Sequence, residues 1–299
     1  MMDWVIAWKL ERCDVFIGMS GLCLKSAQRA REKYGAWIFI ERGSTHILRQ
    51  KEILDQLRQL GMPGEGVSSF DLQRELASYE LADVITIPSL HVEESFQPYG
   101  HLREKLFRNP YGADLTCFSA TTTPDWQQPT LLFVGQWGFR KGCDLLEPIM
   151  EKLPGVRLMH VGGLGDYPWP KAGNFEHCPA VNEWELPKYY AQAHVFVLAS
   201  REEGFAKVLL QAAACGLPIV CTDQTGGRDL QQMVGAANFV KVVACDDVDA
   251  FAAAVRQALD YARAHPGLRS LPDAVREQVS WRSYGQRYSA KLAEVGRTG

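Results

Sequence analysis

Two loops of the sequence place charged residues between a predicted strand and a predicted helix. The first follows the apolar run Thr130 to Val134 and reads GQWGFRKG at residues 135–142. Its adjacent cations, Arg140 and Lys141, stand among three glycines and would suit a diphosphate at a strand-to-helix turn. The alternative is a pair of solvated loop charges. A Gly-Lys-Ser/Thr sequence is absent, so this turn is not a nucleoside-triphosphate P-loop.

The second loop follows the apolar run Val195 to Leu198 and includes Glu203, Gly204 and Phe205 just before a helix. Carboxylates accept hydrogen bonds from hydroxyls, and unpaired N–H groups near Gly204 and Phe205 can face an anion. Gln211 lies about two turns into the helix and can point toward the same crevice. Such acceptors suit sugar and ribose hydroxyls. The alternative is an ordinary helix whose acidic first turn complements the macrodipole.

A third turn reads GGLGD at residues 162–166 and contains Gly163. It is similar to a dinucleotide-binding fingerprint, but Pro168 occupies the position of the third glycine, which argues against a nicotinamide or flavin cofactor. The alternative for these glycines is a tight turn with positive φ.

These loops depend on a sheet that presents them together. Short β-branched and aromatic runs alternate with helix-like stretches, which predicts an α/β fold with a parallel sheet, and such sheets bind ligands at the carboxyl ends of their strands. A polar segment at residues 121–125 predicts a linker, hence domains at 1–120 and 121–272 with a terminal segment at 273–299. Expected strands are 14–17, 36–40, 84–88, 130–134, 156–161, 195–198, 218–221 and 239–243. Expected helices are 22–34, 46–60, 70–81, 144–153, 206–215, 248–264 and 273–295.

Composition excludes several classes of protein. The 299 residues include 32 Lys and Arg against 35 Asp and Glu, a formal balance of −3, which argues against nucleic acid as a partner. The eight cysteines lack paired zinc or thioredoxin spacing, so reduced cytosolic thiols are expected. Asp3 and Lys9 interrupt the apolar start, which argues against an export signal, and later apolar runs are too short to span a bilayer.

The second half resembles the family-4 retaining glycosyltransferases of the GT-B fold. The similar motifs occur in the family's order over about 150 residues, and together they are specific although each alone is weak. They are Phe133-Val134-Gly135 with Lys141-Gly142, Val161-Gly162-Gly163, Tyr190 to Val197, Glu203-Gly204-Phe205, Cys215 to Pro218, and Gly226-Gly227. The first half is also similar, through residues 80–89 and 109–118, and Trp281, Tyr284 and Tyr288 look like the family's terminal helix, which crosses back to the first domain.

The resemblance implies two Rossmann-like domains facing a cleft, with the nucleotide sugar on the second domain. Lys141 matches the lysine that neutralises the donor diphosphate, with help from Arg140, and Glu203 matches the first Glu of the Glu-x7-Glu motif, which contacts the transferred sugar. The resemblance places Gly135, Gln136, Gly163, Gly204, Phe205 and Gln211 around the donor. No metal and no cofactor beyond the donor are implied.

Three departures from the family pattern stand out. Gln211 replaces the second Glu, which binds the ribose, and keeps one acceptor without the charge. Gln136 replaces an arginine that is common in that turn. The family usually begins with a further strand, a glycine-rich loop and another βα unit, so the first domain is expected to be incomplete.

The acceptor side is expected in the turn after residues 37–40. The family's acceptor-side histidine follows that strand, and His46 is the nearest candidate, although it is displaced along the chain. The alternative is a histidine on a helix face. Arg42 and Ser44 are further candidates for phosphate or hydroxyl contacts.

The resulting hypothesis is a metal-independent hexosyltransferase that moves a sugar from a nucleotide-diphosphate sugar to a hydroxyl acceptor with retention. Acceptors in the family are glycans, lipids and polysaccharides, so a lipid-linked acceptor and peripheral contact with the inner face of the membrane stay open for a cytoplasmic protein. The alternative is a non-catalytic relative that binds a nucleotide sugar or a partner, and a third interpretation is a nucleotide-sugar epimerase.

Overall fold

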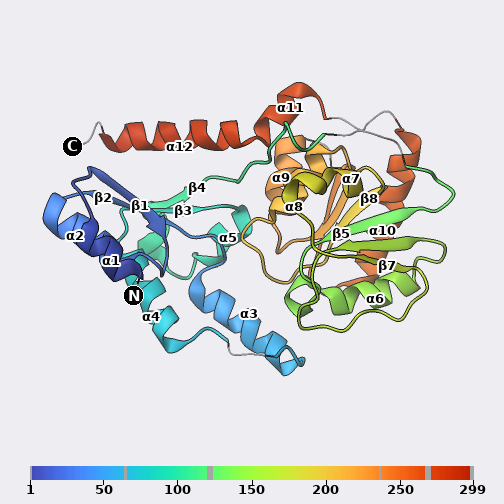
Figure 1. Cartoon of the computed structure of the whole chain (residues 1–299), viewed down its shortest axis with the longest axis horizontal. Coiled ribbons are helices and arrows are strands. Elements are labelled where there is room, and N and C mark those ends of the chain that lie inside the picture. Colours follow the sequence, from blue (N-terminus) through green and yellow to red (C-terminus); the bar gives the residue numbers. More distant parts are fainter. Residues whose placement is uncertain (1, 64–65, 120–123, 236, 267–270, 297–299) are drawn as a thin grey trace. The chain divides into compact units, whose positions relative to one another are not determined.

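The chain forms two units, each built on an all-parallel sheet (Figure 1). The computed structural model describes residues 2–63, 66–119, 124–235, 237–266 and 271–296. Unit 1 comprises residues 1–110 and 286–299, and unit 2 comprises residues 111–285. The sequence places the boundary near residue 120 instead, and the threonines of its predicted linker, at 121–123, lie outside the described residues.

The four strands of the unit 1 sheet lie in the order in which they follow one another along the chain, β1-β2-β3-β4. The strands are β1 Val15–Met19, β2 Trp37–Glu41, β3 Val84–Ile87 and β4 Leu106–Arg108. The helices are α1 Met2–Lys9, α2 Leu24–Tyr34, α3 Ile47–Gln59, α4 Ser69–Leu81, α5 Leu90–Ser95 and the 3-10 helix η1 Gly100–Lys105. β1, β2 and β3 confirm the strands predicted at residues 14–17, 36–40 and 84–88.

The unit 2 sheet has six strands in the order β10-β9-β8-β5-β6-β7. The strands are β5 Thr130–Val134, β6 Arg157–Val161, β7 Phe175–Cys178, β8 Val195–Leu198, β9 Ile219–Thr222 and β10 Val240–Val243. Within this unit the chain enters the sheet at the central strand β5 and proceeds outward through β6 and β7. It then returns to the other side of β5 at β8. The neighbouring strands β5 and β8 are therefore the topological switch point of a doubly wound sheet.

Helices connect the strands of unit 2. They are the 3-10 helices η2 Phe139–Lys141 and η3 Glu183–Glu185, and the α-helices α6 Cys143–Glu151, α7 Pro187–Tyr190, α8 Lys207–Ala214, α9 Gly227–Val234, α10 Val248–Ala264 and α11 Asp273–Gln278. β5 and β8 are buried along their whole length, as expected for central strands covered on both faces. The apolar runs that predict them reflect this burial.

The single terminal helix expected at residues 273–295 is wrong, because the structure divides it into α11 and α12 (Trp281–Gly296). Between them the chain pairs with Ala113, whose N–H donates to the carbonyl oxygen of Val279 at 2.7 Å. The Ser280 hydroxyl then accepts from the N–H of Ser283 at 3.1 Å and begins the new helix. This contact needs a glycine beside it, since a Cβ on Gly112 would lie 2.2 Å from the Trp281 nitrogen.

Residues from Gln286 onward on α12 belong to unit 1. The Arg287 guanidinium donates to the Asn109 side-chain oxygen at 2.7 Å, and the Tyr288 hydroxyl bonds to the carboxylate of Glu41 at the end of β2. Burial raises the pKa of Glu41, and the hydrogen bond from Tyr288 acts in the opposite direction. These contacts anchor α12 to the carboxyl ends of the strands in unit 1.

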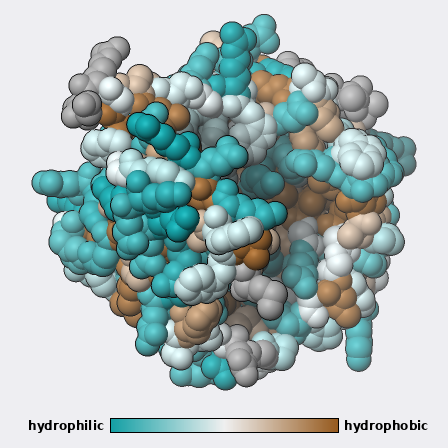
Figure 2. Space-filling model, turned by 60° about the vertical axis from the view of Figure 1, so that its left-hand side comes forward, coloured by the Kyte–Doolittle hydropathy of each residue, from teal (hydrophilic) through white to brown (hydrophobic). Residues whose placement is uncertain are grey.

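Each unit has its own hydrophobic core. That of unit 1 includes Ile38, Ile40 and Ile85, and that of unit 2 includes Phe133 and Phe196. On the face displayed in Figure 2, hydrophobic side chains form several patches separated by hydrophilic surface. The two cores are separate clusters, so each unit is packed around its own sheet and helices.

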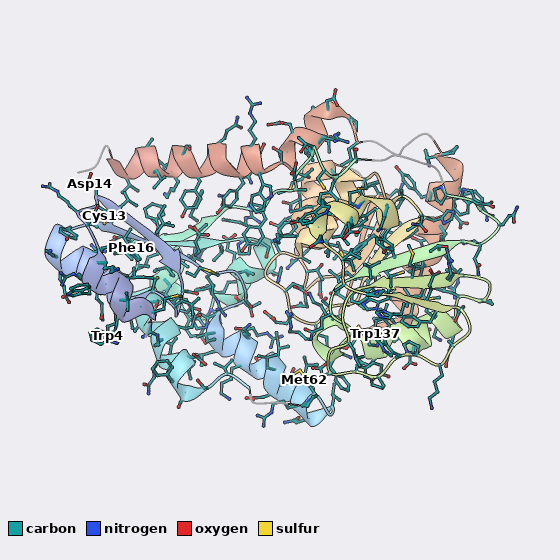
Figure 3. The ribbon with its side chains drawn as sticks, in the orientation of Figure 1. Trp4, Cys13, Asp14, Phe16, Met62 and Trp137 are labelled. Atoms are coloured by element: carbon teal, nitrogen blue, oxygen red, sulfur yellow. The ribbon has the colours of Figure 1, made fainter. Side chains whose placement is uncertain are left out.

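The apolar N-terminus forms helix α1, which is attached to α2 by Asp3. The Asp3 carboxylate accepts from the N–H groups of Lys25 and Ser26 at 2.8 and 2.9 Å, and thereby caps the first turn of α2. Burial alone would raise the pKa of Asp3, but hydrogen bonds from Ser26, Lys25 and Arg74 outweigh it and hold that pKa below its ordinary value. Trp4, the next residue of α1 (Figure 3), is exposed, and its ring centroid lies 5.4 Å from Lys25 Nζ of α2.

Candidate functional site

The two charged loops predicted from the sequence follow neighbouring strands. β5 and β8 pair in parallel, with Leu131 opposite Val195. The loop at residues 135–142 leaves β5, and the loop at residues 199–206 leaves β8. Because the chain winds in opposite directions from these strands, their shared carboxyl edge is the position at which parallel sheets of this kind bind ligands. The topology thus brings Lys141 and Glu203, which are 62 positions apart in the sequence, into contact.

Glycines allow the loops to approach closely. Gly142 has a φ of 69°, and a Cβ on it would lie 2.0 Å from the carbonyl oxygen of Ala199. A Cβ on Gly162 would lie 1.9 Å from the carbonyl oxygen of Gly135. Neither position has room for a side chain. A Cβ on Gly163, in contrast, would have no heavy atom within 4 Å, so the space in front of Gly163 is open.

Buried aromatic and histidine side chains anchor the turn after β5. Trp137 is fully buried, and Figure 3 shows it in unit 2, while the preceding Gln136 is exposed. The His160 Nε2 lies 2.8 Å from the carbonyl oxygen of Gly135, which can only accept, so this nitrogen donates. Burial lowers the pKa of His160 to about 4, and the ring is therefore neutral near pH 7.

Arg201 joins the two loops, and sequence reasoning missed it. Its N–H donates to the carbonyl oxygen of Arg140 at 3.0 Å, and its guanidinium to that of Phe139 at 2.9 Å. The same guanidinium binds both carboxylate oxygens of Asp144, at 2.7 and 2.8 Å, and Asp246 at 2.7 Å. Burial alone would lower the pKa of Arg201, but these carboxylates raise it above its ordinary value. Arg201 therefore stays charged and fixes the first loop against the second.

The predicted catalytic residues meet at this edge. The Lys141 ammonium bonds to Oε1 of Glu203, which also accepts from the Ser200 hydroxyl at 3.0 Å. Arg140 Nη1 lies 3.9 Å from Oε2 of Glu203 and 3.3 Å from Oε2 of Glu202. The side chains of Lys141 and Glu203 are 17% and 11% exposed, so both are partly shielded yet reachable from solvent.

This arrangement can hold a ligand that has an anionic group and, beside it, a group with hydroxyls. Lys141 and Arg140 offer N–H donors with positive charge to a phosphate. Glu203 offers an acceptor to a hydroxyl, and Ser200 orients its carboxylate. An anionic ligand would replace Glu203 as the partner of Lys141 and leave that carboxylate to accept from another donor.

The remaining predicted donor residues lie along α8 and its preceding loop. Phe205 is buried against the backbone of Gly226, where a Cβ would lie 2.7 Å from the ring. Gly204 is also buried. Gln211 is 5% exposed, accepts from the Tyr190 hydroxyl at 3.0 Å and donates to Glu183 at 2.9 Å. Sequence reasoning missed Glu183, because no spacing relates η3 to α8.

The acceptor-side candidates lie in unit 1, after β2. The Arg42 guanidinium is buried and binds Glu75 at 3.0 Å, the Thr45 carbonyl oxygen at 2.6 and 2.9 Å, and Gln50 at 2.8 Å. These contacts favour a structural role, and its role toward an acceptor stays a prediction. Ser44 is half-buried.

His46 begins helix α3 and is fully buried. Its Nδ1 accepts from the N–H of Leu48 at 3.3 Å, and its ring stacks on Tyr99 with centroids 3.7 Å apart. Burial lowers the pKa of His46 to about 4, and the positive charge of Arg42 acts in the same direction. The neutral ring serves as a helix cap in an aromatic cluster.

Two negative findings concern the described residues. No group of three or more His, Cys, Asp or Glu side chains within residues 2–63, 66–119, 124–235, 237–266 and 271–296 is arranged to hold a metal ion. In the same part of the chain, every helix is too short or too polar to cross a bilayer.

The fold is that of the GT-B glycosyltransferases. HepE from Anabaena, solved in complex with UDP-glucose, is similar over 98% of this chain and 81% of its own, with a TM-score of 0.70 and 13% sequence identity. At this identity the similarity concerns the fold, two parallel-sheet α/β domains.

Part of the second unit is similar to a family of glycosyltransferases. Residues 128–261 match the family model described as glycosyl transferases group 1. The matched segment lies wholly within unit 2 and includes both charged loops.

Two relatives of known activity match smaller parts of the chain. Sulfoquinovosyl transferase SQD2 of Arabidopsis thaliana is 34% identical over 109 residues, which cover 35% of this chain and 21% of SQD2. O-antigen chain mannosyltransferase B of Escherichia coli is 39% identical over 103 residues, covering 34% of this chain and 25% of that protein. The matched segments thus span a quarter or less of these relatives.

Proposed function

We propose that the protein transfers a hexose-type sugar from a nucleotide-diphosphate sugar to a hydroxyl acceptor, with retention at the anomeric carbon. The observation that carries this proposal is the meeting of Lys141, Arg140 and Glu203 at the β5–β8 switch point. Their position inside the segment that matches the glycosyl transferases group 1 model supports it, as do the sugar-transferring activities named for SQD2 and mannosyltransferase B.

In the proposed reaction the main barrier is charge on the leaving group. As the bond from the anomeric carbon to the diphosphate oxygen breaks, negative charge builds on the diphosphate. Lys141 and Arg140 stabilise this charge in a site already organised by Arg201, so little reorganisation accompanies the step. Glu203 accepts hydrogen bonds from hydroxyls of the transferred sugar.

The atoms balance without a protein nucleophile. The acceptor oxygen forms a bond to the anomeric carbon on the face that the diphosphate leaves, and the acceptor proton passes to the departing diphosphate oxygen. This scheme uses neither a cofactor nor a metal. We place the reaction in the cytoplasm and take the acceptor to be a glycan, a polysaccharide or a lipid-linked hydroxyl, with peripheral contact at the inner membrane face in the last case.

The test is incubation of the full chain with a panel of nucleotide-diphosphate sugars, measuring nucleotide release with and without added sugar and lipid acceptors. The proposal predicts release from at least one donor, and an α-linked donor should give an α-linked product by NMR. An inverted product would overturn the retaining mechanism. No release from any donor, with nucleotide still bound, would overturn the proposed catalysis.

A second candidate function is non-catalytic binding of a nucleotide sugar. The amide of Gln211, where the resembled family has a carboxylate, favours it. The same panel separates the two functions, since a binding protein would show saturable donor binding by calorimetry and no nucleotide release.

A further inference from the structure

Exposed hydrophobic side chains are concentrated in one short segment of unit 1. Of the thirteen large hydrophobic side chains that are exposed among the described residues, eight lie within residues 2–22. Single exposed hydrophobic residues are normal on a protein surface, whereas a concentrated group marks an interaction site. The eight are Met2, Trp4, Val5, Ile6 and Trp8 of α1, Ile17 and Met19 of β1, and Leu22 of the turn that follows β1.

Helix α1 is hydrophobic around most of its circumference. Only Asp3 and Ala7 are buried, and their spacing of four residues places them on one face of the helix, against α2. A helix that is apolar all round is normally buried, yet here Trp4 and Trp8 are 64% and 76% exposed. Within the described residues, the remaining faces of α1 therefore have no protein surface against them.

The edge strand β1 is open on one side. It pairs with β2, and no strand of the described residues pairs with its other side. The Trp37 N–H donates to the Asp14 carbonyl oxygen at 2.9 Å, so in this parallel ladder the even-numbered residues of β1 face β2. The odd-numbered residues, Val15, Ile17 and Met19, therefore direct their backbone N–H and C=O groups outward.

Nothing in the sequence of β1 protects this edge. Edge strands are usually protected by a charged residue, a proline or a bulge, whereas β1 reads VFIGM and pairs with β2 in continuous register. Phe16 contacts the core on the side of α2, so Ile17 and Met19 lie on the opposite face, where they are 47% and 60% exposed. Because α1 packs on α2 and α2 on β1 (Figure 1), exposed hydrophobic side chains flank the open edge on both faces.

The charges of this segment favour a protein surface over a lipid surface. Lys9 and Arg12 are balanced by Glu11 and Asp14, whereas helices that bind anionic membranes have an excess of Lys and Arg. The exposed side chains of α1 also surround the helix, instead of forming one apolar face opposite a charged one. A partner that pairs with the edge and covers both of its flanks meets these features.

We infer that this surface binds a second copy of the chain, with the two β1 strands paired antiparallel about a two-fold axis through Ile17. The Ile17 N–H and C=O groups then bond to those of the second Ile17, and the Met19 N–H bonds to the Val15 carbonyl oxygen of the other copy. The two sheets become one continuous sheet. This inference is independent of the proposed function.

The hydrophobic surface is large enough for such a dimer. At about 150 to 250 Å² for a whole aromatic side chain, Trp4 and Trp8 alone expose roughly 200 to 350 Å². A stable interface buries about 800 Å² on each partner, and the six other exposed side chains and the edge backbone add to the two tryptophans. An axis perpendicular to the sheet keeps α1 of both copies on the same side, where their exposed faces can meet.

Sedimentation velocity of the full chain tests the inference, which predicts a dimer. Ile17→Lys places two ammonium groups opposite each other at the axis and should raise the dissociation constant about 100-fold or more, because like charges that face each other across an interface oppose association. Leu60→Lys, at an exposed position of the same unit, is the matched control and should stay dimeric. A monomeric parent, or equal dissociation constants in Ile17→Lys and the parent, would overturn the inference.

An exchange of charge tests the position of the axis. Ile17→Glu should also be monomeric, and mixing it with Ile17→Lys should restore a dimer, since opposite charges then face each other. Circular dichroism should show both variants folded, because residue 17 is exposed. A mixture that stays monomeric would overturn the pairing of residue 17 with itself.

Two further variants separate the backbone contact from the contact through α1. Ile17→Pro removes only an outward N–H, so the fold should persist while the dimer is lost. Trp8→Ser should weaken the dimer about 10-fold through lost apolar contact. A monomeric parent that floats with vesicles containing phosphatidylglycerol, when Trp8→Ser does not, would assign α1 to a lipid surface and overturn the inference.

Discussion

The turn after β5 in unit 2 and the turn after β2 in unit 1 both place basic side chains at the carboxyl end of a parallel strand, but their surroundings differ. In unit 2, Lys141 and Arg140 stay partly exposed beside Glu203. In unit 1, Arg42 is buried, with Glu75 and two further partners around its guanidinium.

Strand order explains this difference. β5 lies beside β8 at a switch point, the position at which parallel sheets of this kind bind ligands. The strands of unit 1 follow one another in chain order, so its sheet has no such point within the described residues. A basic residue after a strand therefore stays available for a ligand or is bound within the protein, according to which strand lies next to it.

Removing Arg42 would give the largest change in stability. Arg42→Ala leaves the Glu75 carboxylate buried without its partner, and we expect unit 1 to lose about 3 to 5 kcal/mol of unfolding free energy. Urea unfolding measures this loss, and nucleotide release per folded molecule should not change. Arg49→Ala is the matched control, because the exposed Arg49–Glu52 pair is worth less than about 1 kcal/mol. Lost transfer at unchanged stability would instead give Arg42 the acceptor-side role.

Glu203→Gln tests the site in unit 2. The amide keeps an acceptor but loses the charge, so turnover should fall about 10- to 100-fold, while nucleotide affinity stays within about twofold. Steady-state kinetics and calorimetry measure the two quantities. Glu176→Gln, at an exposed ion pair with Arg157, should change neither. Weaker nucleotide binding at unchanged turnover would contradict the contact with the transferred sugar.

Acidification should destabilise unit 1 through His46. Its folded-state pKa of about 4 lies below the unfolded value of about 6.5, so the unfolded chain binds the proton more tightly. Stability is constant above about pH 6.5 and falls toward pH 4, by about 2 kcal/mol at pH 5.

His46→Asn keeps a capping side chain and should remove this part of the loss in urea unfolding at pH 7 and pH 5. His265→Asn, at an exposed position in unit 2, should leave the loss as it is. An unchanged loss in His46→Asn would show that other groups carry the acid sensitivity. His160 should produce a similar loss in unit 2, because its pKa is also lowered to about 4.

Arg140→Ala should have the smallest effect. The Arg140 side chain is 40% exposed and 3.9 Å from Glu203, so solvent screens its charge more than that of Lys141. We expect kcat/KM to fall about fivefold, equivalent to about 1 kcal/mol. A loss as large as that of a Lys141 variant would make the two cations equal partners.

The sequence predicts the central strands of both sheets because burial on two faces leaves apolar runs, as in β5 and β8. It does not predict β7, an edge strand that contains Glu176 and His177, or the break between α11 and α12, which depends on pairing with distant Ala113. Short edges and breaks set by tertiary contacts leave no periodic signal.

Some residues of the candidate site can likewise be predicted from the sequence and others cannot. Lys141 and Glu203 can be located because each lies in a loop with a local pattern of charge and glycine. Arg201 cannot, since its role depends on Asp144, 57 residues away, and Glu183 depends on Gln211, 28 residues away. Contacts between loops become visible only once the strand order is known.

Lys141→Ala gives the most direct test of the account, through single-turnover sugar transfer compared with the parent and with Lys171→Ala, an exposed lysine between β6 and β7. The account predicts a loss of about 10²- to 10³-fold in Lys141→Ala at unchanged thermal stability, and full activity in Lys171→Ala. Full activity in Lys141→Ala would contradict the assignment of the leaving diphosphate to the turn after β5.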